Sequence, residues 1–389
     1  MRGMVDVLRR RGDEHSAYIE PSDAEPLRAE MRQEFGGVGV KIQLDGDPPV
    51  LKIVEPPEPG SPAFRSEIRS GDTVIEVDSK PIAGMRLTEI LGLMRGAPGE
   101  PIVLTILHEG SEDPVAVRLV REVIRVPSVI GDTRRPDGSW RFRLEEDSRV
   151  ALVRITTFGN RTTEELTETL GTLTSEGVEG ILLDVRNNSG GALDTALSVS
   201  ELFLGSDKLI LSTRGRDGEV LDAFSTSGSG AYRDLPIVVL IDRNTASASE
   251  IVAAALQDHR RAVVVGERSF GKGTVQQLIP LDSNRSLLKL TSASYWRPSG
   301  VNIHRRPNTP ESEAWGVSPS AGRAVSMDDE AYLGWLRWRR NRDLLAELTQ
   351  VDAGANDADE ATEVTETNRE ADPTLLLGLE TLQQQLDAS

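Results

Sequence analysis

The chain has 389 residues and carries 44 lysines and arginines against 62 aspartates and glutamates, a formal net charge of −18. A chain this acidic lacks the basic surface of a general nucleic-acid binder, and without cysteine it has no disulfide, thiol nucleophile or cysteine-ligated metal. Its length predicts two or three domains of about 100–200 residues each. The histidines lie far apart in the sequence and show no metal-ligand spacing, so we do not expect a zinc or haem enzyme; they are His15, His108, His259 and His304.

The amino-terminal segment, residues 1–34, is polar, and we predict that it is helical with a break near Pro21. Met1–Arg11 contains four arginines but no apolar stretch of the kind that a secretion signal has. Nowhere does the chain approach the roughly 18 consecutive apolar residues of a membrane span. The best apolar run, Leu235–Ile241, has seven residues and is typical of a buried strand.

Residues 35–125 contain short apolar segments separated by turn sequences rich in glycine and proline. Phe35–Val40 opens this stretch, and Leu87–Arg95 is apolar at a spacing that predicts one short helix. Ile102–Leu107 and Val115–Val120 are predicted strands that close the stretch. We therefore expect a small β-rich domain here.

From about residue 148 the pattern changes to strands that alternate with helices. Predicted strands lie at Val150–Thr157, Gly180–Arg186, Lys208–Ser212, Leu235–Ile241, Arg261–Glu267 and Val275–Ile279. Predicted helices lie at Thr163–Glu176, Ala192–Leu204 and Ala246–His259. This alternation is typical of βαβ units in a largely parallel sheet covered by helices. Because ligands of such sheets bind at the carboxyl ends of the strands, we expect the loops at 187–191, 242–247 and 267–273 to face one cleft.

The carboxy-terminal region, residues 331–389, has three parts. Tyr332–Leu345 mixes tryptophan with arginine, which favours an amphipathic helix docked on the core over a membrane-surface helix or a nucleic-acid patch. Residues 352–372 hold eight acidic residues and one arginine and predict a solvated linker. Leucines recur through Pro373–Leu386, which predicts a short docking helix.

The first residue that could carry chemistry lies in the turn after the strand that ends at Ile241. Ser247 stands there at the predicted start of a helix, where backbone N–H groups and the helix dipole favour developing negative charge. Serine is also a common helix N-cap, so this position alone does not establish a nucleophile.

A second loop, Ser269–Gly273, places Lys272 between two glycines after another predicted strand. A lysine that is to act as a base needs its pKa lowered from roughly 10.4 towards 7, and burial can supply that shift. A serine and a lysine can act together without histidine, which fits a chain whose histidines form no cluster. Taken alone, Lys272 fits a solvated loop residue better.

The same stretch, Gly266–Thr274, almost matches the phosphate-binding loop GxxxxGK[ST]. Gly273 occupies the position of the metal-binding Ser or Thr, and the apolar residues that follow predict a strand. A phosphate loop needs a helix there, because the helix N-terminus must face the anion. We therefore set the nucleotide-binding interpretation aside.

The pairing of these two loops closely resembles one family. The segments TASASEI at 245–251 and FGKG at 270–273 resemble the carboxy-terminal processing peptidases, also called tail-specific serine proteases. The resemblance implies that Ser247 is the nucleophile, that Lys272 is the general base and that Gln276 orients the lysine. It implies no metal and no other cofactor.

The glycine loop NNSGG at 187–191 resembles the NNPGG loop of the same family, with Ser189 in place of proline. The resemblance implies that the backbone N–H groups of Gly190 and Ala248 form the oxyanion hole.

Residues near these motifs are expected to have supporting roles. Asp184 and Arg186 stand beside the glycine loop, where they either orient it or form a structural ion pair. Glu250 is expected to complement the dipole in the first turn of its helix. His15, in a segment DEHSAY that resembles a leading motif of the family, is expected to be structural rather than catalytic.

The β-rich stretch resembles the PDZ domain of the family, in the opening FGGVGV at 35–40 and in RSGDTVI at 69–75. PDZ domains bind a free carboxy-terminus by strand addition, and backbone N–H groups of a Gly-Φ-Gly-Φ loop hold its carboxylate. The loop that fits this role consists of Gly37, Val38, Gly39 and Val40.

The resemblance covers most of the chain and implies its architecture. It implies an α/β protease core of βαβ units, similar to crotonase and Clp protease, with an inserted β-rich PDZ domain and helical amino- and carboxy-terminal segments. The expected parts are an amino-terminal helical segment at 1–34, the PDZ domain at 35–125, the protease core at 126–330 and a helical region at 331–389 that contains the acidic linker 352–372.

The implied function is that of a serine endopeptidase that recognises protein carboxy-terminal tails through its PDZ domain and cleaves near them. The expected partners are proteins or peptides with free, apolar carboxy-termini and not nucleic acid; peripheral membrane contact through residues 332–345 and homo-oligomers stay open. The alternative is a PDZ-bearing tail-binding or scaffold protein whose protease core is weak or gated by a partner. The resemblance implies a periplasmic or cell-envelope location, and the lack of a signal peptide in this sequence makes a cytoplasmic location the alternative.

Overall fold

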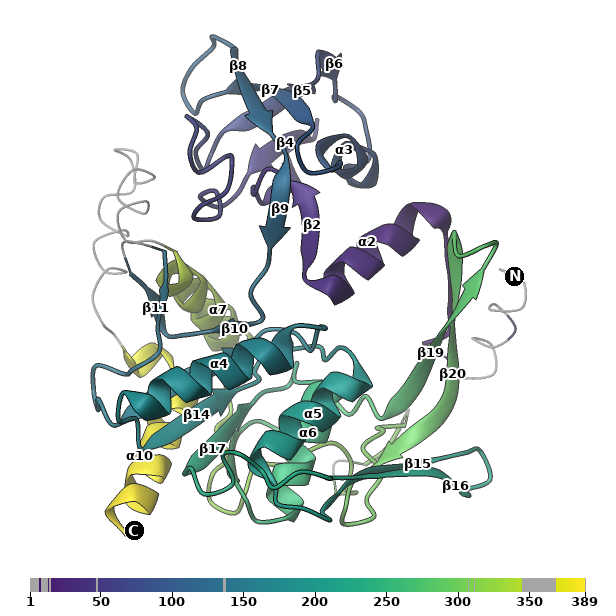
Figure 1. Ribbon diagram of the computed structural model, residues 1–389, viewed down its shortest axis with the longest axis vertical. Coiled ribbons are helices and arrows are strands. Elements are labelled where there is room, and N and C mark those ends of the chain that lie inside the picture. The colour runs from purple at the N-terminus through teal and green to yellow at the C-terminus, as the bar shows by residue number, and fades with distance from the viewer. Residues whose placement is uncertain are drawn as a thin grey trace.

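A computed structural model of the protein describes residues 7, 13, 15–46, 48–135, 138–306, 308–310, 312–344 and 369–388. In this part of the chain a small β-domain stands above a larger α/β body, and a narrow two-stranded connection joins them (Figure 1). The connection consists of β2 (Glu34–Gly37) and β9 (Glu122–Arg125), which pair antiparallel.

The β-domain is built on one antiparallel sheet. Its elements are β3 (Ile42–Asp45), β4 (Val50–Ile53), β5 (Thr73–Val77), β6 (Lys80–Pro81), α3 (Leu87–Met94), β7 (Pro101–Leu107) and β8 (Val115–Val120). The strands pair in the order β3-β4-β5-β7-β8, and β6 pairs with β5. Alternate residues of β7 (Ile102, Leu104 and Ile106) are fully buried, because a strand places successive side chains on opposite faces. Ile90 and Met94 of α3 complete this core.

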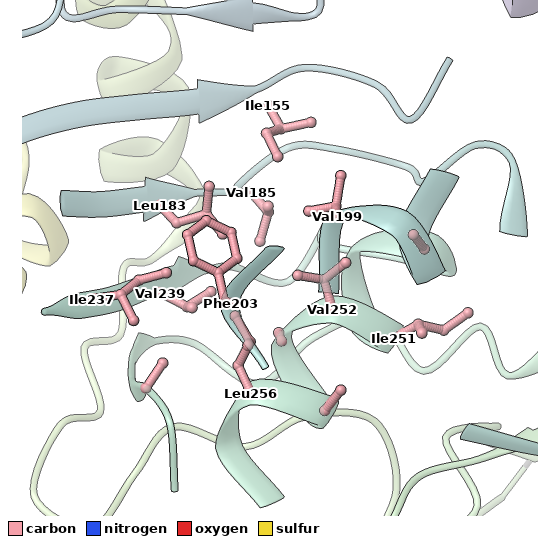
Figure 2. Close-up of a cluster of buried hydrophobic side chains, with 14 of the residues drawn as sticks. Ile155, Leu183, Val185, Val199, Phe203, Ile237, Val239, Ile251, Val252 and Leu256 are labelled. Atoms are coloured by element: carbon pink, nitrogen blue, oxygen red, sulfur yellow. The ribbon is translucent and has the colours of Figure 1, made fainter. Parts of the chain in front are cut away.

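The α/β body is organised around a parallel sheet. Its elements are β10 (Val129–Ile130), β13 (Val150–Ile155), α4 (Thr162–Ser175), β14 (Gly180–Asp184), α5 (Leu193–Phe203), β17 (Ile237–Ile241), α6 (Ala248–Asp258), β18 (Val263–Gly266) and α10 (Pro373–Asp387). β13, β14, β17 and β18 run parallel in that order, and β10 is antiparallel to β13. On one face, Leu183 and Val239 gather with Phe203 of α5 (Figure 2). On the other face, Leu182 and Leu240 pack with the leucines of α10.

A second sheet of the body is antiparallel, and the sequence does not predict it. Its strands are β1 (Ala17–Ile19), β15 (Leu209–Arg214), β16 (Val220–Ser225), β19 (Thr274–Leu281) and β20 (Ser286–Trp296). The predicted strands at Lys208–Ser212 and Val275–Ile279 belong to this sheet and not to the parallel one, which corrects the prediction. Both are arms of hairpins, β15 with β16 and β19 with β20. The second hairpin turns through Asp282, Ser283 and Asn284, all with positive φ, and strands joined by so short a turn must pair antiparallel.

The amino-terminal segment contains a strand as well as a helix. The helix α2 (Pro21–Arg32) has proline at its first residue, where the missing N–H group is not needed. Ala17–Ile19, predicted as helix, forms β1 instead and pairs with residues 287–289 of β20. Pairing with a neighbouring strand outweighs the weak helix preference of so short a segment. Apart from Val7, the prediction for residues 1–12 lies outside the described residues.

Two helices end the described chain. The tryptophan- and arginine-rich segment forms α7 (Asp329–Asp343), which buries Tyr332 and Trp335 against the body. After it, the acidic linker lies outside the described residues as far as residue 368. Its last residue, Asp372, is fully buried and caps α10, so it is not part of a solvated linker. Arg186, two residues after the end of β14, supplies the counter-charge that makes this burial possible.

Candidate active site

Three loops come together at one edge of the parallel sheet. The loop at 187–191 follows β14, the turn at 242–247 follows β17, and the loop at 267–273 follows β18. Since β14, β17 and β18 are adjacent and parallel, their carboxyl ends meet at the same edge. A backbone hydrogen bond of 2.9 Å from Ala246 N–H to Asn188 O joins the first two loops directly.

Ser247 occupies the sharp turn between β17 and α6. Its backbone has φ 55° and ψ −116°, a combination that residues other than glycine rarely adopt. Thr245 braces the turn, because its hydroxyl donates to Val185 O (3.0 Å) and accepts from Asp242 N–H (2.9 Å). Backbone strain of this kind persists where surrounding contacts enforce it, typically at functional sites. Because α6 begins at Ala248, the Ser247 side chain stands at the N-terminus of a buried helix.

The glycine loop packs directly on this turn. Gly190 has φ 103°, and a Cβ atom there would lie 2.8 Å from Ser247 Cβ and 2.9 Å from Ala248 N, so only glycine fits. The two predicted oxyanion donors, Gly190 and Ala248, therefore adjoin the serine and each other. The Gly190 N–H group donates to Asn188 Oδ1 at 2.8 Å. If Gly190 forms the predicted oxyanion hole, a substrate oxyanion would have to displace this neutral amide oxygen, and a charged acceptor is the stronger competitor for the N–H group.

Glu250 joins the serine turn to the lysine loop. Its Oε2 atom accepts from the N–H groups of Ser247 (2.8 Å) and Lys272 (2.9 Å). Its Oε1 atom accepts from the N–H group of Gly271 (2.7 Å) and from the hydroxyl of Ser269 (2.5 Å). The side chain is completely buried, and burial raises the pKa of Glu250 to about 7 although these hydrogen bonds act to lower it. One carboxylate therefore fixes both loops relative to each other.

This role of Glu250 goes beyond the helix-dipole role predicted from the sequence. A signal for part of it is present, since Ser247 and Glu250 have the S-x-x-E spacing of a capping box, in which the glutamate accepts from the N-cap N–H group. The spacing does not reveal that Gly271 and Lys272 donate to the same carboxylate from another loop.

Lys272 is half-buried in the loop between β18 and β19. Burial lowers its pKa, the charge of nearby Lys289 lowers it further, and the charge of Glu250 acts in the opposite direction. The pKa of Lys272 therefore lies below its ordinary value, which suits a lysine that acts as a base. Within the part of the chain that the structure describes, no hydrogen bond joins Lys272 Nζ to Ser247 or to Gln276.

Gln276, the residue predicted to orient the lysine, lies on β19. Its Nε2 atom donates to Thr274 Oγ1 (3.1 Å) and to Thr291 Oγ1 on the neighbouring strand β20 (3.0 Å). Lys289, whose charge acts on Lys272, lies two residues before Thr291 on β20. The lysine loop and the Gln276 side chain therefore adjoin the same part of β20.

The predicted carboxylate-binding loop lies where the two-stranded connection enters the β-domain. Gly37 ends β2, and Val38 is buried in the core of the β-domain. Gly39 has φ 83°, and a Cβ atom there would lie 2.2 Å from Ser61 Cβ, so this position also requires glycine. Val40 is half-buried at the end of the loop.

A cavity of about 530 Å³ lies between this loop and the α/β body. The β-domain lines it with Val40 and Lys41, and the body lines it with Asn187 of the glycine loop and Trp335 of α7. The cavity therefore extends from the predicted carboxylate-binding loop to Asn187, the first residue of the glycine loop.

A buried ion cluster lies at the base of the glycine loop. Arg186 pairs with Asp184 (2.7 Å) and with Asp372 at the start of α10 (2.6 Å). Trp335 Nε1 donates to Asp372 (3.0 Å), and the Arg186 guanidinium stacks 4.6 Å from the centre of the Trp335 ring. The sequence leaves open whether Asp184 and Arg186 orient the loop or form a structural pair. In the structure they form a cluster that ties α7 and α10 to the strand that carries the loop.

The site therefore combines a strained serine at a helix N-terminus with backbone N–H groups beside it, as the active site of a serine hydrolase requires, and the adjoining loop carries a lysine of lowered pKa. Among the described residues, no helix is long and apolar enough to cross a membrane. In the same part of the chain, no group of His, Cys, Asp and Glu side chains could hold a metal ion.

Known proteins similar to this chain identify its family. Residues 149–314 match peptidase family S41, and residues 53–107 match the PDZ domain. The chain is 37% identical over 303 residues to a carboxy-terminal-processing protease of Bartonella bacilliformis, a match that covers 77% of this chain and 66% of that protein. It is 30% identical over 338 residues to a chloroplastic C-terminal processing peptidase of Tetradesmus obliquus, which covers 85% of this chain and 68% of that protein. A solved photosystem II D1 C-terminal processing protease is 28% identical, with 83% of this chain and 80% of that chain covered and a TM-score of 0.46.

The chain therefore belongs to the carboxy-terminal processing peptidases of family S41, with a PDZ domain in its amino-terminal half. It spans about two thirds of the length of these curated relatives, 66% of one and 68% of the other. The family predicted from the sequence motifs is confirmed.

Glu250→Gln should lower the kcat for peptide cleavage by about 100-fold, because small displacements of reacting groups have effects of that order. The carboxylate accepts from four donors, two on each oxygen. A glutamine has one acceptor oxygen, so its NH₂ group would face two donors and push the serine and lysine loops apart. Steady-state kinetics on a short peptide substrate measure the effect.

Glu165→Gln is the matched control for this substitution. Glu165 Oε2 also accepts from a backbone N–H group and from a hydroxyl, both of Ser128 and both at 2.8 Å. Neither Glu165 nor Ser128 belongs to the three loops of the site. We expect the control to lose stability without losing kcat. Wild-type cleavage by the Glu250→Gln enzyme would show that the carboxylate is not needed to hold the loops.

Proposed function

We propose that the protein is a serine endopeptidase in which Ser247 is the nucleophile, Lys272 the general base and Gln276 the residue that orients the lysine. The observation that carries this proposal is the buried Glu250 carboxylate, which holds the Ser247 turn and the Lys272 loop together. We also propose that the core has the crotonase-like and Clp-protease-like architecture that the sequence resemblance implies.

In the proposed reaction, the unprotonated Lys272 amine takes the proton of the Ser247 hydroxyl while the serine oxygen attacks the scissile carbonyl carbon. The N–H groups of Gly190 and Ala248 hold the resulting oxyanion, and one such donor typically changes the rate by ~100-fold or more. The lysine then passes its proton to the leaving amine nitrogen, the C–N bond breaks and an acyl-enzyme remains. Water attacks the acyl-enzyme with Lys272 again as base, and the serine regains its proton.

The proposed substrates are proteins or peptides whose free, apolar carboxy-terminal tail binds the PDZ domain. In this proposal the backbone N–H groups of the loop at 37–40 hold the tail carboxylate. The cavity between that loop and Asn187 supports the proposal, because a chain held at Val40 can run through it to the first residue of the glycine loop. The small valines of the loop favour apolar tails.

A second candidate is a tail-binding or scaffold protein whose protease core is weak or gated by a partner. Two observations favour it: among the described residues Lys272 Nζ makes no hydrogen bond to Ser247, and the Gly190 N–H group is engaged by Asn188. Before Ser247 can attack a substrate, Lys272 Nζ has to approach the serine hydroxyl and the Gly190 N–H group has to leave Asn188. In this alternative a bound partner would make the change.

The experiment that separates the two candidates uses an unfolded reporter with an apolar carboxy-terminal tail, either free or amidated. An endopeptidase of the proposed kind cleaves the free-tail reporter about 10-fold to 100-fold faster than the amidated one, because amidation removes hydrogen bonds to a charged group. Equal cleavage of both reporters would contradict tail recognition. Tail binding without cleavage would favour the second candidate.

The compartment, the oligomeric state and membrane contact are also proposals. We propose a periplasmic or cell-envelope location, as the family resemblance implies, which fractionation of cells would test against a cytoplasmic location. Sedimentation of the purified chain tests for a homo-oligomer. The proposed membrane contact through 332–345 would have to use the exposed side of α7. Tyr332 and Trp335 pack on the body and Arg339 is buried with Asp132, so these three side chains cannot take part.

A further inference from the structure

A chain of hydrogen bonds runs from the amino-terminal segment to Gln276. Gln276 Nε2 donates to Thr291 Oγ1 at 3.0 Å, and Thr291 Oγ1 donates to Asp13 Oδ1 at 2.8 Å. Asp13 is far from Gln276 in sequence and belongs to neither catalytic loop. Because β1 pairs with β20, the residues just before β1 are brought to Thr291.

The direction of each hydrogen bond in this chain follows from the proton count. The Thr291 hydroxyl has one proton, and two acceptors are within reach: Asp13 Oδ1 at 2.8 Å and Gln276 Oε1 at 3.4 Å. The shorter contact, to a carboxylate, takes the proton, since charge-assisted hydrogen bonds are the stronger ones. The Thr291 oxygen is then an acceptor toward Gln276, and only the amide NH₂ group can donate to it.

The Gln276 amide is thereby held in one orientation. Its Nε2 atom has two acceptors, Thr274 Oγ1 and Thr291 Oγ1. Its Oε1 atom, 3.4 Å from Thr291 Oγ1, is then left to accept from another donor. If the amide were turned over, its oxygen would meet Thr291, whose proton is engaged by Asp13, and no oxygen would be left for another donor.

Asp13 is itself firmly held as an acceptor. Its Oδ1 atom accepts from the N–H groups of His15 (3.1 Å) and Ser16 (3.0 Å), and its Oδ2 atom accepts from the Ser16 hydroxyl (2.5 Å). Ser16 Oγ also accepts from Thr291 N–H (3.0 Å), which fixes the segment on β20. Burial acts to raise the pKa of Asp13, but the hydrogen bonds outweigh it and hold the pKa below the ordinary value, so the side chain is a carboxylate.

We propose that Asp13 is a positioning residue for catalysis: through Thr291 it fixes the Gln276 amide so that Oε1 accepts a hydrogen bond from Lys272 Nζ and the amine lone pair is directed at Ser247. This inference rests on the proposed roles of Lys272 and Gln276. In it, the segment before β1 is part of the catalytic apparatus although it touches no substrate. The same Oε1 atom stabilises the ammonium that forms when lysine takes the serine proton.

The decisive comparison is Thr291→Val against Thr291→Ser, because valine has the shape of threonine without its hydroxyl and serine keeps the hydroxyl. For Thr291→Val we expect kcat to fall about tenfold with KM little changed, since the interaction matters in the proton transfer and not in tail binding. Thr291→Ser should retain at least a third of the wild-type kcat, within about threefold. A purely structural role would lower the amount of folded enzyme and leave kcat per folded molecule unchanged.

A second readout does not depend on proteolysis. In the Ser247→Ala background, the rate of acylation of Lys272 by a lysine-directed reagent is followed against pH by peptide mass spectrometry. Thr291→Val removes a fixed acceptor from the ammonium, which favours the neutral amine, so the midpoint moves to lower pH, while Lys289 and Glu250, the charged groups that act on Lys272, are unchanged. Thr291→Ser should keep the wild-type midpoint.

Asp13 is tested in a double-mutant cycle. Asp13→Ala should lower kcat and shift the Lys272 midpoint as Thr291→Val does, and the double variant should be no worse than either single one. Ser286→Ala, which removes a hydroxyl-to-carboxylate hydrogen bond to Asp282 (2.6 Å) at the start of β20, is the control and should keep the midpoint. An unchanged midpoint in Thr291→Val, or additive effects with Asp13→Ala, would overturn the inference. Failure of the proposed peptidase function would appear differently, as a wild-type enzyme that cleaves no reporter.

Discussion

Lys272→Met should lower kcat/KM for the tail-bearing reporter by about 10⁴-fold or more, and Ser247→Ala should do the same. Lys272 is the residue near Ser247 whose pKa is lowered by burial and by the charge of Lys289. Methionine keeps the length and apolar stem of lysine, so the loop should stay in place. Reporter cleavage and circular dichroism on both variants measure activity and folding side by side.

The double variant and a neighbouring lysine provide the controls. If the two residues act as a unit, Ser247→Ala with Lys272→Met should be no slower than either single variant. Lys289→Met should still cleave, but removal of its positive charge should raise the pKa of Lys272 and move the acid limb of the pH–rate profile to higher pH. Cleavage by Lys272→Met at the wild-type rate would exclude lysine as the base.

The parts of the site that the sequence predicts are those encoded in short segments. Ser247 and Lys272 follow buried strands, which appear in the sequence as continuous apolar runs because both faces of a parallel strand are covered. Such runs place both loops at the carboxyl edge of the sheet without knowledge of any tertiary contact. The close packing of Gly190 on Ser247 agrees with the expected position of the glycine loop.

The parts that could not be predicted depend on contacts between distant segments. Nothing near Glu250 in the sequence indicates that Lys272 N–H donates to it, and nothing near Asp13 indicates Thr291. The pairing of strands is likewise not predictable from a local pattern. The apolar pattern of Val275–Ile279 predicts a strand but does not show that it pairs with β20 in an antiparallel sheet.

The acidic composition of residues 352–372 led to a wrong prediction for Asp372, which is buried and not solvated. Asp372 ends a run of acidic residues and therefore resembles the solvated linker before it. Its burial is possible only because Arg186 supplies the opposite charge in the body, and the first turn of α10 supplies a further donor in Leu375 N–H (2.9 Å). Neither Arg186 nor Leu375 lies within the acidic segment, so the composition of that segment cannot reveal that Asp372 is buried.

Arg186→Ala should lower the free energy of unfolding by roughly 3–5 kcal/mol, because it leaves two buried carboxylates without a counter-charge. The side chains of Arg186, Asp184 and Asp372 are 1%, 4% and 0% exposed. Burial acts to raise the pKa of Asp372, but the charge and hydrogen bonds of Arg186 outweigh it and hold the pKa below its ordinary value. Without the guanidinium, the effect of burial should dominate and raise the pKa of Asp372. Urea denaturation of the full chain measures the loss, and hydrogen exchange should rise first in α10.

Arg149→Ala is the matched control, since Arg149 also reaches α10 but from the surface. It pairs with Asp147 (2.8 Å) and with Asp387 at the other end of the helix (3.2 Å), and its side chain is 39% exposed. Exposed ion pairs contribute about 1 kcal/mol or less, so the control should unfold close to the wild-type urea concentration. Equal destabilisation by the two substitutions would show that the buried cluster holds α10 no more strongly than a surface ion pair. A larger loss in Arg186→Ala, accompanied by weaker reporter cleavage, would show that the carboxy-terminal helix supports the strand that carries the glycine loop.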